Sequence, residues 1–324
     1  MSKKPPEPAT GQPLPSVPGQ ADRLLRHLEW HVIRRLDGLL QGDYRTLVRG
    51  SGLDLADLRE YQPHDDVRHI DWNVTARLNA PHVRVFTEDR EMSAWFLLDL
   101  SPSIHFGPQG HAKRDILTRF VAVLARLLTR HGNRVGAMLY GAGGAGGAKN
   151  AEGRSARAVD AVLPPRNSRA QVLQLVHRLL QPAADRAAGG TQLGLLLQAG
   201  LGGIRRRSTV FVVSDFISAP GWEKPLAQLA QRHDVVAVRL FDPLELELPD
   251  LGLVLLRDAE TGEQLQVDTH DKAFRQRFAR LSAEREAALR TSLAAAGADT
   301  LELRTDDDLI DALLRFMDLR QRRA

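Results

Sequence analysis

The chain has 324 residues, of which 44 are lysine or arginine and 40 are aspartate or glutamate, so its formal net charge is only +4. It contains no cysteine, which excludes disulfide bonds, thiolate metal sites and a cysteine nucleophile. A chain of this length buries a sufficient core without such cross-links. It has neither an apolar run of about 18 residues nor a secretory signal at its start, so we expect no membrane span and a cytoplasmic location.

The first part of the chain divides into a tail and a helix. Residues 1–20 are rich in Pro, Gly and Gln and lack hydrophobic periodicity, which predicts a disordered tail. From Ala21 to Leu40 apolar residues recur at helical spacing. We expect this helix to pack on the domain that follows.

A polar segment, residues 52–77, comes next. Its acids and arginines alternate with single large apolar residues, which favours a buried network of ion pairs and hydrogen bonds. Asp71, Trp72 and Arg77 would form one such cluster. We interpret the segment as a structural staple that holds the start of the domain against the sheet, while a catalytic role for the cluster stays open.

An apolar run of strand length, residues 95–98, ends abruptly in Asp99, Ser101 and Ser103. The run predicts a buried parallel strand, and open α/β sheets place their sites at the carboxyl ends of such strands. The three side chains offer only hard oxygens, which suit Mg²⁺ or Mn²⁺. Taken alone, however, serine and aspartate at a strand-to-helix turn also fit simple capping of the next helix.

Two distant segments strengthen the metal interpretation. Thr191 follows two glycines and opens an apolar helix, and Asp215 ends a second apolar strand, residues 210–214. Asp-x-Ser-x-Ser, then this threonine, then this aspartate resembles the metal-ion-dependent adhesion site of von Willebrand factor type A domains. The resemblance implies that Asp99, Ser101, Ser103, Thr191 and Asp215 bind one metal ion.

The remaining elements alternate between helices and strands. Such alternation requires right-handed crossovers and a mainly parallel sheet. The patterns predict, in order, a helix over 113–130, a strand over 134–140, a glycine-rich surface insert over 141–153, an edge strand over 158–163 that Pro164 and Pro165 end, a helix over 171–180, a helix over 192–204, a strand over 209–216, a helix over 224–232 and a strand over 235–240.

The rhythm changes after Asp242. Residues 253–257 and 264–267 suggest an antiparallel hairpin. A long charged helix over 272–296, with Phe274, Phe278, Leu281 and Leu289 as its inward side, a strand over 300–303 and a helix over 307–320 complete the chain. The arginine runs at 205–207 and 320–323 are interpreted as solvated helix ends, and no nucleic-acid partner is expected.

The chain resembles the bacterial domain of unknown function 58 family. Residues that carry the resemblance are Arg59-Glu60-Tyr61, Asp65-Asp66, Arg68, Ile70-Asp71-Trp72, Val83-Arg84, Asp99 to Ser103, Asp242-Pro243-Leu244-Glu245, Leu248-Pro249 and Thr261-Gly262-Glu263. The family is similar to von Willebrand factor type A domains and is commonly encoded beside MoxR-type AAA+ ATPases. The resemblance covers roughly residues 25–320.

This resemblance implies an α/β fold, a von Willebrand factor type A-like (Rossmann-like), mainly parallel sheet flanked by helices, with an N-terminal extension. We divide the chain into a tail (1–20), an N-terminal helix with the polar segment (21–92) and the sheet domain with its C-terminal hairpin and helices (93–324). The implied function is that of a non-enzymatic adaptor, whose metal ion is completed by an Asp or Glu of a partner, by resemblance a MoxR-type ATPase or its client.

A metal-assisted hydrolase that uses the same site is the alternative. His105 is the nearest titratable candidate for a general base, but we interpret it as a loop residue. No Gly-x-Ser-x-Gly nucleophile motif is present. A scaffold that binds no metal stays a third possibility.

Overall fold

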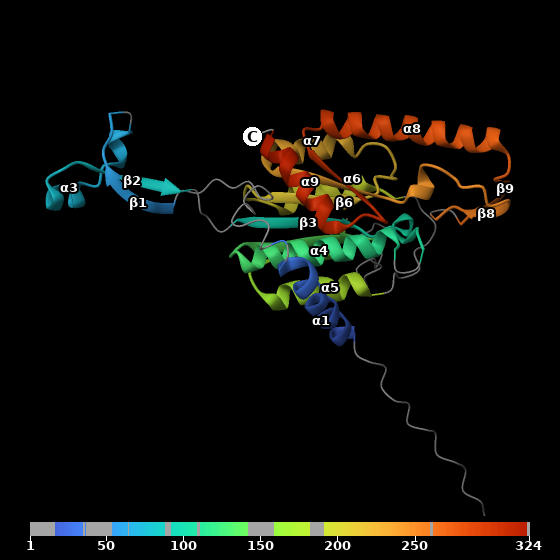
Figure 1. The fold of residues 1–324 in the computed structure, drawn as a ribbon, viewed down its shortest axis with the longest axis horizontal. Helices are drawn as coiled ribbons and strands as arrows, with labels where there is room; N and C mark the ends of the chain where they lie inside the picture. Colours follow the sequence, from blue (N-terminus) through green and yellow to red (C-terminus); the bar gives the residue numbers. More distant parts are fainter. Residues whose placement is uncertain are drawn as a thin grey trace, which may run out of the picture.

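Figure 1 shows the fold in a computed structural model, which describes residues 17–34, 36, 54–63, 65–87, 92–108, 111–141, 159–181, 191–259 and 262–322. Most of the predicted tail, the glycine-rich insert after Gly141 and the linker before Thr191 lie outside the described residues. The first helix, α1 (Val17–Leu28), begins inside the predicted tail and continues as a π-helix, η1 (Glu29–Ile33). Within the described ranges, no helix combines the length and the apolar character that crossing a membrane requires.

The body of the protein is a six-stranded sheet with the strand order β10-β7-β6-β3-β4-β5. Neighbouring strands are parallel except β4 and β5, which are antiparallel. The strands are β3 (Ser93–Asp99), β4 (Arg134–Tyr140), β5 (Ala161–Arg166), β6 (Thr209–Ser214), β7 (Asp234–Phe241) and β10 (Asp299–Arg304). The chain builds outward from β3 to β4 and β5, and then returns to the other side of β3 with β6. The carboxyl ends of β3 and β6 therefore form the switch point where open α/β sheets bind ligands.

Helices cover both faces of this sheet, which explains why its central strands are apolar along their whole length. In β3, Phe96 and Leu98 belong to one core, and Trp95 and Leu97 belong to the other. The first core contains residues of α1, α4, α5 and α9, and the second contains residues of α6, α7 and α8. These helices are α4 (Lys113–Arg130), α5 (Arg169–Leu180), α6 (Leu193–Gly203), α7 (Glu223–Arg232), α8 (Lys272–Ala295) and α9 (Leu309–Arg322).

The polar segment forms a separate antiparallel pair, β1 (Asp54–Glu60) with β2 (His82–Thr87). A short 3-10 helix, η3 (Val67–His69), and α3 (Trp72–Leu78) connect the two strands. We call these four elements the N-terminal ribbon. In Figure 1 the ribbon and the hairpin of β8 (Leu253–Arg257) and β9 (Gln264–Asp268) lie at opposite ends of the molecule.

The prediction of a buried cluster in this ribbon is wrong. Trp72 is 70% exposed and Arg77 is also exposed, while Asp71 caps α3 by accepting the backbone N–H groups of Asn73 and Val74. Asp66 and Asp71 thus satisfy local backbone donors at helix starts, which is the ordinary role of aspartate there.

Three other expectations, for β5, for Leu281 and for Arg320, need correction. β5 does not end before its prolines but runs through Pro164 and Pro165 to Arg166, with an irregular register against β4. Such prolines are tolerated because β5 is an edge strand. Leu281 of α8 is 54% exposed. The buried residues of α8 are Ser282, Glu286 and Leu293.

The third correction concerns Arg320, which the sequence pattern assigned to a solvated helix end. In the structure it is 2% exposed and ion-paired with Asp234 and Asp299.

Candidate functional site

The loop that follows β3 is ordered by its own polar groups. Asp99 Oδ1 accepts the backbone N–H of Ser101 at 3.0 Å, and the Oγ atoms of Ser101 and Ser103 lie 3.2 Å apart. All three side chains are buried. Ser101 occupies the N-cap position of the 3-10 helix η4 (Pro102–His105), yet its side chain makes no capping hydrogen bond. Simple capping therefore does not account for Ser101.

Gly141 holds this loop from the side of β4. It has a φ of +90°, and a Cβ at this position would lie 2.5 Å from the carbonyl carbon of Leu100 and 2.6 Å from the nitrogen of Ser101. Only glycine permits this approach of two backbones. The sequence pattern assigned Gly141 to a flexible insert, and the structure shows that it instead packs directly against the loop.

The end of β6 is bonded to the same loop. The Ser214 hydroxyl donates to Asp99 Oδ2 at 2.7 Å and accepts the N–H of Phe216 at 2.9 Å. Asp215 is fully buried, and its Oδ1 accepts the N–H of Ile217 at 3.0 Å. Phe216 has a φ of +55°, an uncommon value for a residue with a side chain. The chain thus turns sharply after β6 and leaves the Asp215 carboxylate beside that of Asp99.

Thr191 lies next to the turn that follows Asp215. Its carbonyl oxygen accepts hydrogen bonds from the Ser218 hydroxyl at 3.0 Å and from the N–H of Ala219 at 2.9 Å, and its side chain is buried. The neighbouring Gln192 N–H donates to the hydroxyl of Tyr140 at 3.0 Å. The segment that carries Thr191 is therefore fastened to the carboxyl ends of both β4 and β6. Whether its hydroxyl binds a metal stays a prediction.

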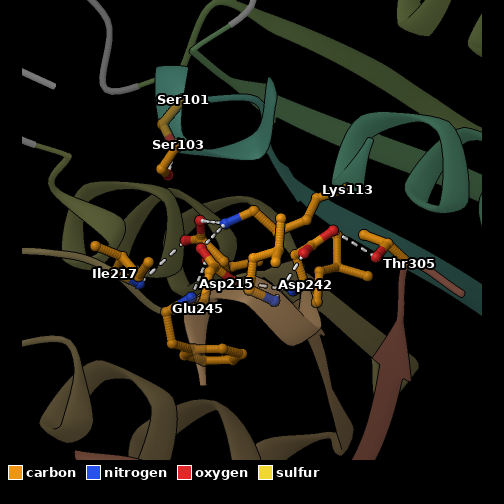
Figure 2. Close-up of polar contacts among 12 residues, drawn as sticks. Ser101, Ser103, Lys113, Asp215, Ile217, Asp242, Glu245 and Thr305 are labelled. Atoms are coloured by element: carbon orange, nitrogen blue, oxygen red, sulfur yellow. Dashed lines mark hydrogen bonds and ion pairs between the residues drawn. The ribbon is translucent and has the colours of Figure 1, made fainter. Parts of the chain in front are cut away.

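Sequence reasoning missed the central residue of this edge, Lys113, the first residue of α4. Its side chain is fully buried, and Nζ lies 2.7 Å from Asp215 Oδ2 and 2.7 Å from Glu245 Oε1 (Figure 2). A signal was available. Helical spacing places Lys113 on the same face as the buried Ile116, Leu117 and Phe120, where a lysine requires a buried partner.

Glu245 is held in place by its own contacts. It ends the 3-10 helix η5 (Pro243–Glu245) after β7, and its Oε2 accepts the N–H of Asp242 at 3.0 Å. The Asp242 carboxylate in turn accepts the N–H of Leu244 and the hydroxyl of Thr305. The Glu245 carbonyl oxygen accepts the hydroxyl of Ser282 in α8 at 2.9 Å. Glu245 therefore links Lys113 to β7, β10 and α8.

We name Asp99, Lys113, Asp215 and Glu245 the carboxyl-edge cluster. When all four side chains are ionised, the cluster holds three carboxylates and one ammonium, which contacts Asp215 and Glu245, so an excess of two negative charges lies in a buried region. Burial, together with the nearby Asp215 carboxylate, raises the pKa of Asp99 from 3.8 to about 6, against the hydrogen bonds from Ser214 and Ser101. The cluster has fewer positive than negative charges, and protonation of Asp99 is one way to reduce this excess.

The donor set fits a hard divalent cation. Adjacent ligands of octahedral Mg²⁺ lie about 2.9 Å apart when each bond is about 2.05 Å, and the two serine hydroxyls are separated by 3.2 Å. Within the described ranges, no cluster of three or more His, Cys, Asp or Glu side chains is arranged to hold a metal. A cation at this edge would therefore depend on the hydroxyl groups of Ser101, Ser103 and Thr191 together with the two aspartates.

His105, the candidate base of the hydrolase alternative, lies at the exposed end of η4. Its Nε2 is 3.4 Å from Arg114 Nη1. Partial desolvation of the imidazole by neighbouring groups and the Arg114 cation lower the pKa of His105, so the ring is neutral near pH 7.

The chain is similar to several known proteins. Uncharacterized proteins of Mycobacterium bovis and Mycobacterium tuberculosis are each 37% identical over 304 residues, which is 93% of this chain and 90% of each relative. Solved structures include the conserved hypothetical protein BatB from Bacteroides thetaiotaomicron, at 14% identity and a TM-score of 0.43 over 71% of this chain and 99% of that one. An aerotolerance-related membrane protein from Bacteroides fragilis matches 72% of this chain and 100% of its own length, at 14% identity and a TM-score of 0.40.

One family model covers most of the chain. The model described as protein of unknown function DUF58 matches residues 57–288, which include the ribbon strand β2, the Asp-Ser-Ser loop, Lys113, Asp215 and Glu245. The chain therefore belongs to the DUF58 family of proteins of unknown function.

Proposed function

We propose that this protein is a non-enzymatic, metal-dependent protein-binding module that works as an adaptor with a MoxR-type AAA+ ATPase. The observation that carries the proposal is the set of buried hydroxyl and carboxylate oxygens, with an excess of two negative charges, at the ends of the neighbouring strands β3 and β6, the switch point of the sheet. This is where an α/β sheet places a ligand. A divalent cation would balance that excess.

The sheet supports a von Willebrand factor type A-like assignment. Its five parallel strands with one antiparallel edge strand, and the Asp-x-Ser-x-Ser loop after the central strand β3, fit that family's arrangement. The identification of the fold as this type is part of the proposal.

Each predicted ligand has a defined role in the proposal. The hydroxyls of Ser101, Ser103 and Thr191 donate oxygen atoms, and Asp99 and Asp215 balance charge directly or through water. A bound Mg²⁺ would supply a coordination position for a carboxylate from outside the chain. The five side chains are at most 5% exposed. The partner's Asp or Glu must therefore be presented on a protruding segment that reaches between the loops.

Metal titration tests the site. Mg²⁺ or Mn²⁺ binding, measured by calorimetry, is expected for the wild-type protein and is expected to be lost in Asp99→Ala and Thr191→Ala. Asp311→Ala and Thr291→Ala, which remove the same groups from exposed positions on α9 and α8, are the matched controls and should bind as the wild type does. Equal affinity in all five proteins would contradict the metal site.

The partner is tested separately. A pull-down from the native cell should recover an AAA+ ATPase with Mg²⁺ present and lose it in chelator or with Asp99→Ala as bait. Recovery of the same amount of ATPase in chelator and with Asp99→Ala would contradict the adaptor role. Turnover of phosphoesters or peptides by the purified protein, abolished in Asp99→Ala, would favour the hydrolase instead.

A further inference from the structure

The carboxyl-edge cluster already contains a cation of its own. Lys113 Nζ contacts Asp215 Oδ2, while the other oxygen of that carboxylate accepts the N–H of Ile217. Both oxygens of Asp215 therefore have a partner. The partner of Oδ2 is the charged ammonium of Lys113, at 2.7 Å. A divalent cation that uses Asp215 must overcome this ammonium.

Two cations that share one buried carboxylate repel each other. The Coulomb energy between charges a few ångströms apart is large wherever water is excluded, and Lys113 and Asp215 are both fully buried. Metal binding and the Lys113–Asp215 contact thus oppose each other, even though carboxylates outnumber cations in the cluster as a whole.

Glu245 offers Lys113 a second position. Its Oε1 is already 2.7 Å from Nζ, and its Oε2 is fixed by the N–H of Asp242. An ammonium has three N–H donors, so Lys113 is able to release Asp215 and remain bonded to Glu245 without leaving the protein interior. Complete loss of a partner would instead leave a buried unpaired charge, which is costly.

We infer that Lys113 is an internal counter-ion that passes from Asp215 to Glu245 when a divalent cation binds. This inference rests on the proposed metal site and adds its regulation. Without metal, Lys113 neutralises Asp215 and keeps the edge folded. With metal, Glu245 receives the ammonium and Asp215 turns to the cation. Because a cation must displace Lys113 to bind, the exchange favours divalent over monovalent ions.

A double-mutant cycle on Mg²⁺ affinity tests the exchange. Lys113→Met removes the competing ammonium and should bind Mg²⁺ at least about tenfold more tightly than the wild type. Glu245→Gln removes the receiving carboxylate and should bind about tenfold more weakly. In the Lys113→Met background the same Glu245→Gln change should alter affinity by less than about threefold, because no ammonium needs a new partner. Lys224→Met and Glu284→Gln, at exposed positions, are the matched controls.

The possible outcomes separate the two proposals. Absence of Mg²⁺ binding in both the wild type and Lys113→Met overturns the metal site and the exchange with it. Binding with equal or weaker affinity in Lys113→Met, or the same Glu245→Gln effect in both backgrounds, leaves the metal site and overturns the exchange alone.

A direct measurement covers the case in which Lys113→Met does not fold. The Nζ resonance of Lys113, observed by NMR in wild-type protein with ¹⁵N-labelled lysine and assigned with Lys113→Arg, should move on addition of Mg²⁺ but not of K⁺. A resonance that stays in place when Mg²⁺ saturates the protein would overturn the exchange.

Discussion

The carboxyl-edge cluster and the N-terminal ribbon have similar residues in opposite environments. Both are rich in acids and basic residues, yet Asp99, Lys113 and Asp215 are fully buried, whereas Arg59 and Trp72 of the ribbon are exposed. In the ribbon, Asp66 and Asp71 cap helices and Asp65 pairs with the exposed Arg59. In the cluster, carboxylates outnumber cations. The comparison shows that the burial of an excess of carboxylates, and not polar composition, distinguishes the candidate site.

The largest expected difference between the regions concerns stability without metal. Lys113→Met leaves Asp215 and Glu245 without their cation, and breaking a buried ion pair in this way costs about 3–5 kcal/mol. Urea unfolding in chelator, followed by circular dichroism, should show a loss of unfolding free energy of this size. A loss below about 1 kcal/mol would mean that the buried ion pairs of the cluster contribute no more than the exposed pairs of the ribbon.

The raised pKa of Asp99 should make the free energy of unfolding depend on pH. Its pKa in the folded protein, about 6, lies above the ordinary value of 3.8, so the folded state binds this proton more tightly than the unfolded state does. The resulting stabilisation is present below about pH 4 and is lost as the pH rises through 6, a change of about 3 kcal/mol.

Asp99→Asn removes this titration. Measured in chelator, the stability of Asp99→Asn relative to the wild type should rise by about that amount between pH 4 and 7, and the exposed control Asp311→Asn should show no such rise. A difference that is flat or falls over this range would contradict the buried, unbalanced environment of Asp99.

The smallest effect is expected in the ribbon. Arg59 makes two hydrogen bonds to Asp65, at 2.8 and 2.6 Å, but its side chain is 42% exposed. Solvent-exposed pairs of this kind contribute at most about 1 kcal/mol. Arg59→Met should therefore lower the unfolding free energy by less than that in the same urea assay. A loss as large as that of Lys113→Met would remove the contrast between the regions.

Much of the sheet domain was predictable because its pattern is local. Strands buried on both faces are continuously apolar, and α4 and β4 have the bounds that the periodicity of residues 113–130 and 134–140 indicates. The loop of Asp99, Ser101 and Ser103 was predictable for the same reason, since an acid that directly ends such a strand lies at the edge where sites form.

The rest of the edge depends on contacts between remote residues. Lys113 and Glu245 are 132 residues apart and meet only because β7 lies two strands from β3 in the sheet. Lys113 lies on the apolar face of its helix, which indicates a buried partner but does not identify it, and Glu245 is not unusual in its own segment. Conversely, Trp72 is of a residue type common in cores, but α3 contributes no buried residue. Local spacing does not reveal which helices pack against a neighbour. Pairing across the fold decided both cases.

The prolines of β5 have a consequence for how this sheet meets other molecules. Successive N–H groups of a strand point to opposite sides, so Pro164 and Pro165 together remove one donor from the β4 side, where the register shifts, and one from the outer rim. A foreign strand that tried to extend the sheet past β5 would find no continuous ladder there. The outer edge of β5 therefore resists edge-to-edge aggregation by strand addition, and a partner that binds there would have to contact its side chains.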